Sequence, residues 1–383
     1  MANTVLYIDQ NNYYGGGQKI TFSVLKYLRN NGWNVVVMFP EGGNLQSIAQ
    51  KENYSYIKLP ILNVGDGKKK IRDYLRYFIN EKNIPIIINK VIKEYRCDII
   101  YTLSPRLLKS IYISSKSSCI PIIFHFHMLY QNFIWELYLK YYLRKSSLKK
   151  IIVLSDYCNN WLKKNVIISD KTIVINNWVV ESEFSDKSLN KIILPSNIPR
   201  SFKFAVIGRI LPIKGQKYFL EAALRQCESE DCTEYYIIGD TNFGDDGYKK
   251  ALQEILNKSL FKTRIHFVPF IESISFAYNF VDCIVVPSVW GEPFGLVAVE
   301  AMFFKKYLII SNTGELPNIV GNGKYASIVN VNDPNDLLQK MNKVLSNSEI
   351  NSIQIEDAKK WVESRYHSAE KLTQLLYEFN KLV

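Results

Sequence analysis

The chain has 383 residues, 47% of them hydrophobic and 22% charged, a composition that excludes a disordered protein and a length that allows two domains. Its six cysteines form no CxxC pair and no Cys/His cluster, which argues against a disulfide framework or a zinc site and favours a reducing cytosol. The N-terminus turns polar too early for a secretion signal, and no apolar run reaches the roughly 20 residues that cross a bilayer. We therefore expect a cytoplasmic protein, at most peripheral on the inner face of the plasma membrane.

The net charge of +12 falls entirely in the first half of the chain. Residues 1–190 contain 26 Lys and Arg against 14 Asp and Glu, whereas residues 191–383 contain 22 of each kind. Such an asymmetry indicates that the first half faces an anionic partner. Nucleic acid would satisfy the charge, but the chain carries no signature of a nucleic-acid-binding fold, so we expect no nucleic-acid partner.

Taken in chain order, short β-branched runs alternate with longer helical patterns. Strands are predicted at 5–8, 35–39, 99–102, 122–126, 151–154, 172–175, 204–208, 235–239, 265–268, 283–287, 307–310 and 326–329. Nearly continuous apolar strands, each followed by an amphipathic helix, are typical of parallel sheets covered on both faces. From residue 351 the pattern is helical to the end.

This alternation fills both halves and predicts an α/β protein with two Rossmann-like, doubly wound domains. The boundary is expected within 181–201, where polar residues and two prolines interrupt the periodicity. We assign residues 1–185 to an N-terminal domain and 186–365 to a C-terminal domain. Residues 366–383 are predicted to form a helix that returns toward the N-terminal domain.

Two cations follow the predicted strand at 204–208. Arg209 stands at the end of this strand, and Lys214 comes just before Gly215. Ligands of doubly wound folds collect at the carboxyl ends of the strands, and two cations placed there ahead of a helix suit a diphosphate. A Lys-Gly pair on its own, however, is more often only a solvated helix start.

The stretch SVWGEPFGLVAVEAM (288–302) places one carboxylate, Glu292, in a turn and a second, Glu300, inside an apolar helix. The free N–H groups near Phe294 and Gly295, at the start of this helix, would attract phosphate. A buried carboxylate needs hydrogen-bond partners, which ribose hydroxyls would supply. The alternative is a turn glutamate and a solvated helix glutamate, but the two cations at the same edge favour a site.

These motifs together resemble family 4 of the retaining glycosyltransferases, enzymes of the GT-B fold. The signature of that family is two glutamates separated by seven residues, which Glu292 and Glu300 match. The resemblance implies two Rossmann-like domains that face across a cleft and transfer a sugar from a nucleotide sugar. It extends over most of the chain through NNYYGGGQ (11–18), PIIFHFH (121–127), VLSDY (153–157), VINNWVVESEF (174–184) and GELPNIV (314–320).

The resemblance also implies roles for residues of the C-terminal domain. Gly208, Arg209 and Lys214 would bind the donor diphosphate, and the two cations would neutralise it as it leaves. Glu292 would hold hydroxyls of the donor sugar, and Glu300 would bind the ribose. Backbone N–H groups for the phosphates would come from Phe294, Gly295 and Leu296.

In the N-terminal domain, Gly16 and Gly17 would let the backbone approach the phosphates, where a side chain would block it. Without the resemblance, a flexible loop explains these glycines equally well. His127 aligns with the family's active-site histidine near the transferred sugar, and His125 on the same strand is a rival. The predicted catalytic residues are His127, Arg209, Lys214 and Glu292.

Three positions depart from the family pattern. Asn177 replaces the glycine of an Asn-Gly turn, which is tolerable because Asn also adopts the left-handed conformation. Asn318 replaces a glutamate of the later loop, and Pro269 stands where the family often has glycine near the base. The base therefore stays undecided, and a UDP- or GDP-sugar is the expected donor.

No Asp-x-Asp motif occurs, so we expect transfer without a metal or any other cofactor, with the basic pair and the helix dipole in the place of Mg²⁺. The expected acceptor is a glycan or a lipid-linked hydroxyl in bacterial surface polysaccharide or glycolipid synthesis. The alternatives are another GT-B activity, such as a nucleotide-sugar epimerase, and a non-catalytic module that binds an anionic membrane or polymer. A dehydrogenase is disfavoured because GGGQKI lacks the third glycine of GxGxxG.

Two segments of the first half combine cations with apolar residues. Segment 67–78 contains Lys68–Lys70, Arg72 and Arg76, and segment 136–150 interleaves Tyr and Leu with Lys and Arg. Cationic amphipathic helices of this kind can lie on an anionic leaflet, although a solvated helix face explains either segment alone. The sequence therefore predicts an anionic membrane surface as a further partner.

Overall fold

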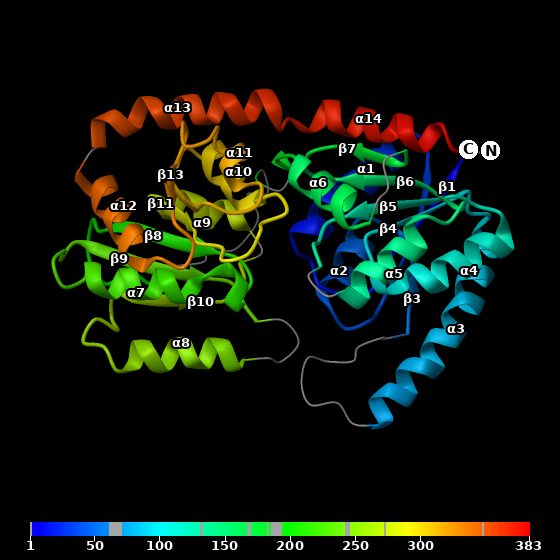
Figure 1. The fold of residues 1–383 in the computed structure, drawn as a ribbon, viewed down its shortest axis with the longest axis horizontal. Helices are drawn as coiled ribbons and strands as arrows, with labels where there is room; N and C mark the ends of the chain where they lie inside the picture. The colour runs from blue at the N-terminus through cyan, green and yellow to red at the C-terminus, as the bar shows by residue number, and fades with distance from the viewer. Residues whose placement is uncertain are drawn as a thin grey trace. The chain divides into compact units, whose positions relative to one another are not determined.

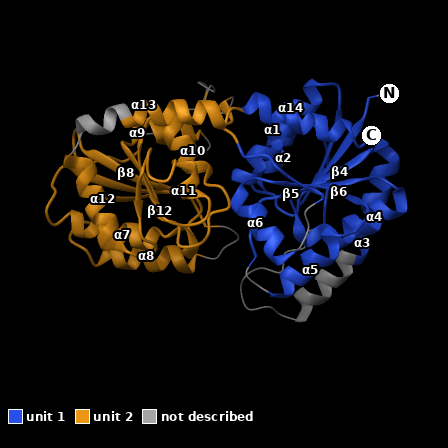
Figure 2. Cartoon of the chain, turned by 45° about the horizontal axis from the view of Figure 1, so that its top comes forward, with its two compact units in different colours: residues 1–177, 368–383 blue, residues 178–367 orange. Residues whose placement is uncertain are grey.

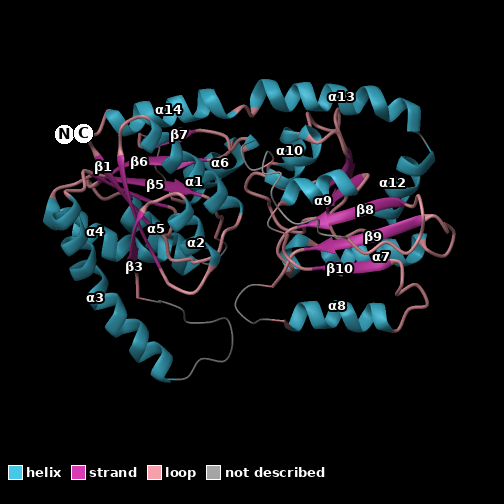
Figure 3. Ribbon diagram, turned by 180° about the vertical axis from the view of Figure 1, so that it is seen from behind, coloured by secondary structure: helices cyan, strands magenta, loops and turns pink. Residues whose placement is uncertain are grey.

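The computed structural model describes residues 2–60, 71–130, 133–166, 170–181, 184, 194–241, 246–271, 273–346 and 348–383. The chain forms two compact units, which are coloured separately in Figure 2. Unit 1 comprises residues 1–177 and 368–383, and unit 2 comprises residues 178–367. In each unit a β-sheet carries helices on both faces (Figures 1 and 3). The two Rossmann-like, doubly wound domains predicted from the sequence are thereby confirmed.

Unit 1 is built on a seven-stranded sheet in the order β3-β2-β1-β4-β5-β6-β7, and its paired strands are parallel. The strands are β1 (Thr4–Ile8), β2 (Asn34–Phe39), β3 (Ser55–Lys58), β4 (Ile99–Thr102), β5 (Ile122–Phe126), β6 (Leu148–Val153) and β7 (Thr172–Val174). The helices are α1 (Gly16–Asn30), α2 (Asn44–Lys51), α3 (Ile71–Tyr95), η1 (Pro105–Leu107), α4 (Leu108–Ser118), α5 (Phe133–Leu143), α6 (Asp156–Asn165) and α14 (Ser368–Asn380).

The burial of these strands follows from their sequences. The five residues TVLYI of β1 are all buried, as expected for a strand with covered faces on both sides. The sequence prediction missed β3, whose residues SYIK include none that is buried. An edge strand this short and polar lacks the apolar run by which the other strands were found.

Helix α14 belongs to unit 1 although it lies near the end of the chain. Its Phe379 packs edge-on against Trp33 and Tyr101, with ring centroids 5.8 Å and 5.3 Å apart. Lys150 Nζ lies 2.9 Å from Glu378 Oε2 on the same helix. The C-terminal helix thus packs on the N-terminal domain, as predicted, because its apolar face completes the core of unit 1.

Unit 2 is built on a six-stranded sheet in the order β10-β9-β8-β11-β12-β13, again with parallel pairs. The strands are β8 (Phe202–Ile207), β9 (Thr233–Ile238), β10 (Ile265–Val268), β11 (Cys283–Val286), β12 (Tyr307–Ser311) and β13 (Ser327–Val329). The helices are η3 (Pro212–Lys214), α7 (Gln216–Gln226), α8 (Gly247–Asn257), α9 (Ile274–Phe280), α10 (Leu296–Phe303), α11 (Leu316–Ile319), α12 (Pro334–Ser346) and α13 (Ser348–Arg365).

The first segment of unit 1 ends at Asn177, whereas the boundary drawn from the sequence follows residue 185. Trp178, the first residue of unit 2, is fully buried. The N–H of Val179 donates to the carbonyl of Tyr366, 3.1 Å away within the same unit. The chain therefore enters the second core before the polar stretch that marked the boundary in the sequence.

The order of strands reverses once in each sheet. In unit 1 the reversal lies between β1 and β4, and in unit 2 it lies between β8 and β11. The connections that leave the carboxyl ends of these two strands diverge to opposite faces, so the backbone opens there. Each switch point is consequently the place where a doubly wound unit binds its ligand.

Candidate active site

The switch point of unit 2 carries the residues that the sequence singled out in the C-terminal domain. Strand β8 is followed by Gly208 and Arg209 and then by η3, which ends at Lys214. The neighbouring strand β11 is followed by the loop that contains Glu292. The carboxyl ends of parallel strands meet at one edge of a sheet, which brings these distant residues together.

Lys214 and Glu292 form an ion pair at this edge. The Nζ of Lys214 donates to both carboxylate oxygens, at 2.9 Å from Oε1 and 2.7 Å from Oε2. The hydroxyl of Ser288 donates to Oε2 of the same carboxylate at 2.9 Å. The side chains of Lys214 and Glu292 are 27% and 14% exposed, so the pair is largely shielded from water but can still be reached by a ligand.

The pKa of the Glu292 carboxyl lies below its ordinary value. Burial alone would raise this pKa, but the charge of Lys214, the hydrogen bonds from Lys214 and Ser288, and the charge of Arg209 together lower it. Glu292 is therefore ionised at neutral pH. With two cations and one carboxylate, the cluster keeps a net positive charge toward a ligand.

Two glycines close the loops around this cluster. Gly215 has φ +71°, and a Cβ there would lie 1.8 Å from the carbonyl oxygen of Pro287, so glycine is required. The N–H of Val289 donates to the carbonyl of Ile213 at 3.0 Å, which ties the two loops to each other. Gly208 has φ +142° and open space where a Cβ would stand, and its N–H donates to the carbonyl of Ile238 at 2.9 Å, so its backbone is held in place beside the cluster.

The loop after β12 supports the main chain of Glu292. Gly314 has φ +62°, and a Cβ there would lie 2.2 Å from the backbone nitrogen of Glu292. The N–H of Glu315 donates to the carbonyl of Glu292 at 2.9 Å. Asn318, one of the departures from the family pattern, places its Nδ2 3.4 Å from Oε1 of Glu315. These contacts hold the backbone that presents the Glu292 carboxylate.

Helix α10 starts in the same loop. Its N-cap is Gly295, with φ +103°, and a Cβ there would lie 2.5 Å from Cδ2 of Leu316. Glycine has no side chain to occupy the unpaired N–H groups of the first turn, which begins at Leu296. The buried side chain of Phe294 packs edge-on against Tyr366 at 5.5 Å. The side chain of Phe294 therefore belongs to the core, and the backbone at Gly295 is not covered by a side chain of its own.

Glu300 lies buried in the second turn of α10. The hydroxyl of Tyr278, on α9, donates to its Oε2 at 2.8 Å. Tyr278 is itself buried and stacks on Phe304, with ring centroids 5.0 Å apart. The sequence analysis did not single out Tyr278. Nothing in the sequence distinguishes this tyrosine, in the helix before β11, from other tyrosines of the core. The carboxylate is thus oriented by a rigid aromatic side chain.

The switch point of unit 1 is organised by Asp9, which the sequence reading also missed. The carboxylate of this residue accepts hydrogen bonds from the Tyr7 hydroxyl at 2.6 Å, the Gln18 amide at 3.0 Å and the Ser104 hydroxyl at 3.0 Å. The backbone N–H of Asn11 donates to it at 2.9 Å. All of these donors are neutral, and burial raises the pKa of the Asp9 carboxyl. The sequence could have indicated Asp9, because it is an acidic residue directly after a buried strand.

This network positions the glycine segment at the start of α1. The Gln18 side chain that donates to Asp9 also accepts from the Gly15 N–H at 3.3 Å. Gly16 is exposed, and Gly17 is half-buried. A Cβ on Gly17 would lie 3.4 Å from Nδ1 of His127, an ordinary contact. The protein's own packing therefore does not demand glycine at this position, which leaves a ligand as the proposed reason for it.

The two histidines at the carboxyl end of β5 have different surroundings. His125 is buried, and its Nδ1 lies 2.7 Å from the hydroxyl of Tyr101. His127 follows the carboxyl end of the strand, half-buried, with its ring 4.0 Å from the ring of His125. Burial lowers the pKa of His127 to about 3, so its imidazole is neutral at physiological pH. This placement favours His127 for contact with a ligand.

Comparison with known sequence families agrees with this geometry. Residues 14–183 match the family described as Glycosyltransferase Family 4, and residues 191–361 match the family described as Glycosyl transferases group 1. The chain belongs to the group 1 glycosyltransferases. The two matches cover most of both units, which confirms the resemblance found in the motifs.

Individual relatives are distant. An uncharacterized glycosyltransferase of Methanocaldococcus jannaschii is 29% identical over 222 residues. The match covers 58% of this chain and 56% of that protein, so it spans only about half the length of the relative.

Two solved structures share the fold over nearly their whole length. A glycosyltransferase from Rickettsia africae has a TM-score of 0.79 at 22% identity and covers 100% of this chain and 98% of its own. Anabaena HepE, solved in complex with UDP and glucose, has a TM-score of 0.80 at 17% identity and covers 99% of both chains. The fold of the chain is therefore that of the GT-B glycosyltransferases.

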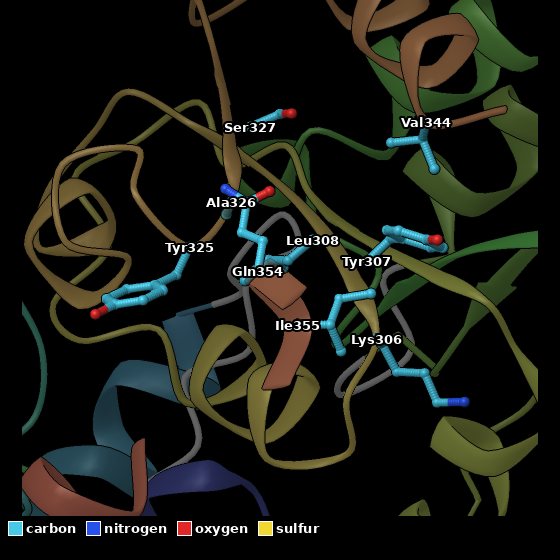
Figure 4. Close-up of a pocket in the computed structure, with 9 residues that line it drawn as sticks. All are labelled: Lys306, Tyr307, Leu308, Tyr325, Ala326, Ser327, Val344, Gln354 and Ile355. Atoms are coloured by element: carbon cyan, nitrogen blue, oxygen red, sulfur yellow. The ribbon is translucent and has the colours of Figure 1, made fainter. Parts of the chain in front are cut away.

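Three further features of the described residues bear on this site. Within those residues, no group of three or more His, Cys, Asp or Glu side chains could hold a metal ion, and no helix is long and apolar enough to cross a membrane. The pocket drawn in Figure 4 has a volume of about 20 Å³ and contains none of the predicted site residues. A nucleotide needs a cavity of several hundred Å³, so this pocket is not a donor site.

Proposed function

We propose that the protein transfers a sugar from a UDP- or GDP-sugar to a hydroxyl of a glycan or lipid-linked acceptor, with retention of configuration and without a metal ion. The proposed setting is surface polysaccharide or glycolipid synthesis. The observation that carries the proposal is the cluster of Arg209, Lys214, Ser288 and Glu292 at the switch point of unit 2. A partly shielded cluster with net positive charge stabilises a diphosphate as it departs with increased negative charge.

The donor would bind to unit 2 through its nucleotide. Its phosphates would lie against Lys214 and the first turn of α10, where Gly295 leaves the N–H groups uncovered. Its ribose would reach Glu300, which Tyr278 holds at one oxygen. A carboxylate accepts hydrogen bonds at both oxygens and donates none, which suits it to ribose hydroxyls.

We propose a front-face route for the reaction. The bond between the anomeric carbon and the diphosphate oxygen breaks while Arg209 and Lys214 stabilise the charge on that oxygen. The acceptor hydroxyl attacks from the same face, and its proton passes to an oxygen of the leaving phosphate. Glu292 is ionised and engaged by Lys214, which suits it to binding sugar hydroxyls rather than attacking carbon.

Two roles are proposed for residues of unit 1. His127 would offer a hydrogen bond to the transferred sugar from a neutral imidazole, since its pKa of about 3 excludes a permanent cation. Gly16 and Gly17 would allow the phosphates to approach the start of α1. Both proposals are supported by position: His127 follows the carboxyl end of β5, and Gly17, at the start of α1, lies next to His127.

A donor screen tests the proposal. We expect one among the UDP-, GDP- and ADP-sugars to raise the melting temperature, with UDP-sugars tested first because a protein of the same fold was solved with UDP. The best donor should be hydrolysed by the wild-type protein, and Glu292→Gln should lose most of this hydrolysis. EDTA should leave turnover intact. Failure of all nucleotide sugars to bind would contradict the proposal, and loss of turnover in EDTA that Mg²⁺ or Mn²⁺ restores would contradict its metal-free form.

The same assay separates the alternatives. A nucleotide-sugar epimerase would rearrange the donor without any acceptor, and its product would be a second nucleotide sugar. A non-catalytic module that binds an anionic membrane or polymer would be indifferent to Glu292→Gln. The shielded ion pair of Lys214 and Glu292 favours an enzyme, because a binding module has no need of a low-pKa carboxylate between two cations.

Residence at an anionic membrane surface remains a prediction. The basic segment that first suggested it gives no structural support, because Lys68–Lys70 lie outside the described residues and only the backbone of Arg72 and Arg76 is described. Cytoplasmic localisation likewise stays a prediction.

A further inference from the structure

Helix α5 exposes one continuous apolar face. Phe133, Ile134, Leu137 and Tyr141 are 70%, 74%, 48% and 58% exposed. Positions separated by three, four and seven residues lie on the same side of an α-helix, so these side chains form one stripe. Leu139 and Leu143, on the opposite side, are buried, which shows that the helix already packs on its own domain.

A single exposed leucine is ordinary on a protein surface, but a stripe of four large apolar side chains on one helix is not. Helix α5 has a high proportion of apolar residues on all sides, a property of helices that are covered on all sides. In unit 1 it lies beside α4 (Figure 1), which covers part of its surface but leaves this stripe in solvent. The stripe therefore calls for a partner outside the domain.

Cations border the stripe at its C-terminal end. Lys140 is half-buried, and Arg144 is exposed, one turn further along. The Nζ of Lys145 lies 3.6 Å from the centroid of the Tyr141 ring and 5.3 Å from that of Tyr112, a cation–π arrangement that holds the ammonium at the edge of the apolar face. The one acidic residue within the helix is Glu136. The chemistry of the border thus selects an anionic partner.

A row of amphipathic aromatic rings runs along the same helix. Trp135 is 5.3 Å from Tyr138, Tyr138 is 4.7 Å from Tyr142, and Tyr142 is 4.9 Å from Tyr141, measured between ring centroids. Tyrosine and tryptophan favour the boundary between hydrocarbon and water, because each combines an apolar ring with a polar group. The row marks the depth at which such a boundary would lie.

We propose that α5 lies flat in the interface of an anionic phospholipid bilayer. The stripe of Phe133, Ile134, Leu137 and Tyr141 enters the region of the upper acyl chains, and Lys140, Arg144 and Lys145 contact the lipid phosphates. This inference deepens the proposed function, since it brings unit 1 to the surface where a lipid-linked acceptor resides. The binding itself requires neither donor nor turnover, so it can be tested separately.

A second copy of the chain is the competing occupant of this face. Two copies packed stripe to stripe would bring two basic borders into one interface, with a single glutamate per helix to offset them. Like charges at an interface oppose association, whereas lipid phosphates complement the same border. The charge therefore favours the bilayer, and the oligomeric state provides an independent check.

Flotation with vesicles tests the proposal. Wild-type protein should float with vesicles of phosphatidylcholine and phosphatidylglycerol in equal parts, and only weakly with phosphatidylcholine alone. Phe133→Gln combined with Leu137→Gln should lower binding by at least about tenfold, because two large side chains no longer enter the hydrocarbon. Arg144→Gln combined with Lys145→Gln should lower it on anionic vesicles only. As a matched control, Leu260→Gln removes a leucine that is 94% exposed in unit 2 and should leave binding unchanged.

Further measurements keep the outcomes distinct. Anionic vesicles should slow the hydrogen exchange of the backbone amides of residues 133–145 in the wild-type protein. This measurement requires no variant. Stabilisation by the donor should be the same in all of these variants, so a failed donor screen would count against the proposed function and not against the membrane site. Wild-type protein that floats with neither vesicle, or a Phe133/Leu137 variant that floats like wild type, would overturn the proposal. So would a wild-type dimer that this variant converts to a monomer.

Discussion

Each unit places a carboxylate at its switch point, and the two carboxylates have different partners. In unit 1, Asp9 accepts hydrogen bonds from four neutral donors among the described residues, and burial raises its pKa. In unit 2, Glu292 is paired with Lys214 and lies near Arg209, and its pKa is lowered. The same topology thus presents one acid as a structural connector and the other as part of a charged site.

The difference shows what each loop is built to do. The Asp9 network joins β1, the start of α1 and the loop after β4, so it maintains a shape even when no ligand is bound. In the Lys214–Glu292 pair, by contrast, the cation can bind a diphosphate and the carboxylate can accept hydrogen bonds from sugar hydroxyls. We therefore expect substitutions at Asp9 to affect stability and substitutions around Glu292 to affect turnover.

The largest effect should come from removing either of the two cations, Lys214 and Arg209, at the switch point of unit 2. Lys214→Ala should lower kcat by about 100-fold, roughly 2.7 kcal/mol, because the departing diphosphate loses a preorganised positive charge. Arg209→Ala should lower it by at least about tenfold. Steady-state kinetics measures both, with Lys217→Ala as a control, since Lys217 is exposed on α7, where it pairs with Glu221 at 3.8 Å. Near-normal turnover in both Lys214→Ala and Arg209→Ala would contradict the assignment.

Asp9→Asn should lower the free energy of unfolding by about 1–3 kcal/mol. Four donors converge on this carboxylate, and an amide offers one oxygen and introduces an NH₂ group that faces other donors. Denaturant unfolding measures the loss, and the affinity of the protein for nucleoside diphosphate should not change. Unfolding energies equal to those of wild type would show that the network is not a structural connector.

Glu300→Ala should weaken nucleoside diphosphate binding by about tenfold, roughly 1.4 kcal/mol, because the ribose loses its carboxylate. Glu292→Gln should leave that affinity nearly unchanged while lowering turnover. Tyr278→Phe keeps the ring that stacks on Phe304 and removes only the hydroxyl bonded to Glu300, so a smaller loss is expected. Calorimetric titration compares the three variants; unchanged affinity in Glu300→Ala would withdraw the ribose role.

The smallest effect concerns pH and His127. Its pKa is about 3 in the folded protein and 6.5 in an ordinary environment, so the unfolded chain binds more protons between these values. Stability should therefore fall as the pH drops through this window, by about 1 kcal/mol between roughly pH 7 and pH 5.5. His127→Asn should remove this part of the acid sensitivity. Melting curves at several pH values measure it, and an unchanged pH dependence in the variant would show that the imidazole of His127 is not held in its neutral form.

Patterns local in the sequence were enough to predict the fold. Apolar β-branched runs followed by amphipathic helices predicted two doubly wound units, because strands covered on both faces must be apolar throughout. The same principle explains the miss at β3, where an edge strand of mixed polarity carries no such pattern. Arg209, Lys214 and Glu292 could be singled out because each lies in the segment after a predicted strand, and ligands of doubly wound folds collect at the carboxyl ends of the strands.

Tertiary structure alone decided how these residues are paired. Lys214 and Glu292 are 78 positions apart, and Ser104 and Asp9 are 95 apart, so no local pattern couples them. Likewise, the sequence contains Tyr278 and Glu300 but not the hydrogen bond that joins them, and it contains two histidines on one strand but not which of them is enclosed by Tyr101. A strand or helix follows from interactions between near neighbours along the chain. A hydrogen bond between side chains depends on where the sheet brings distant strand ends together, and only the folded backbone determines that.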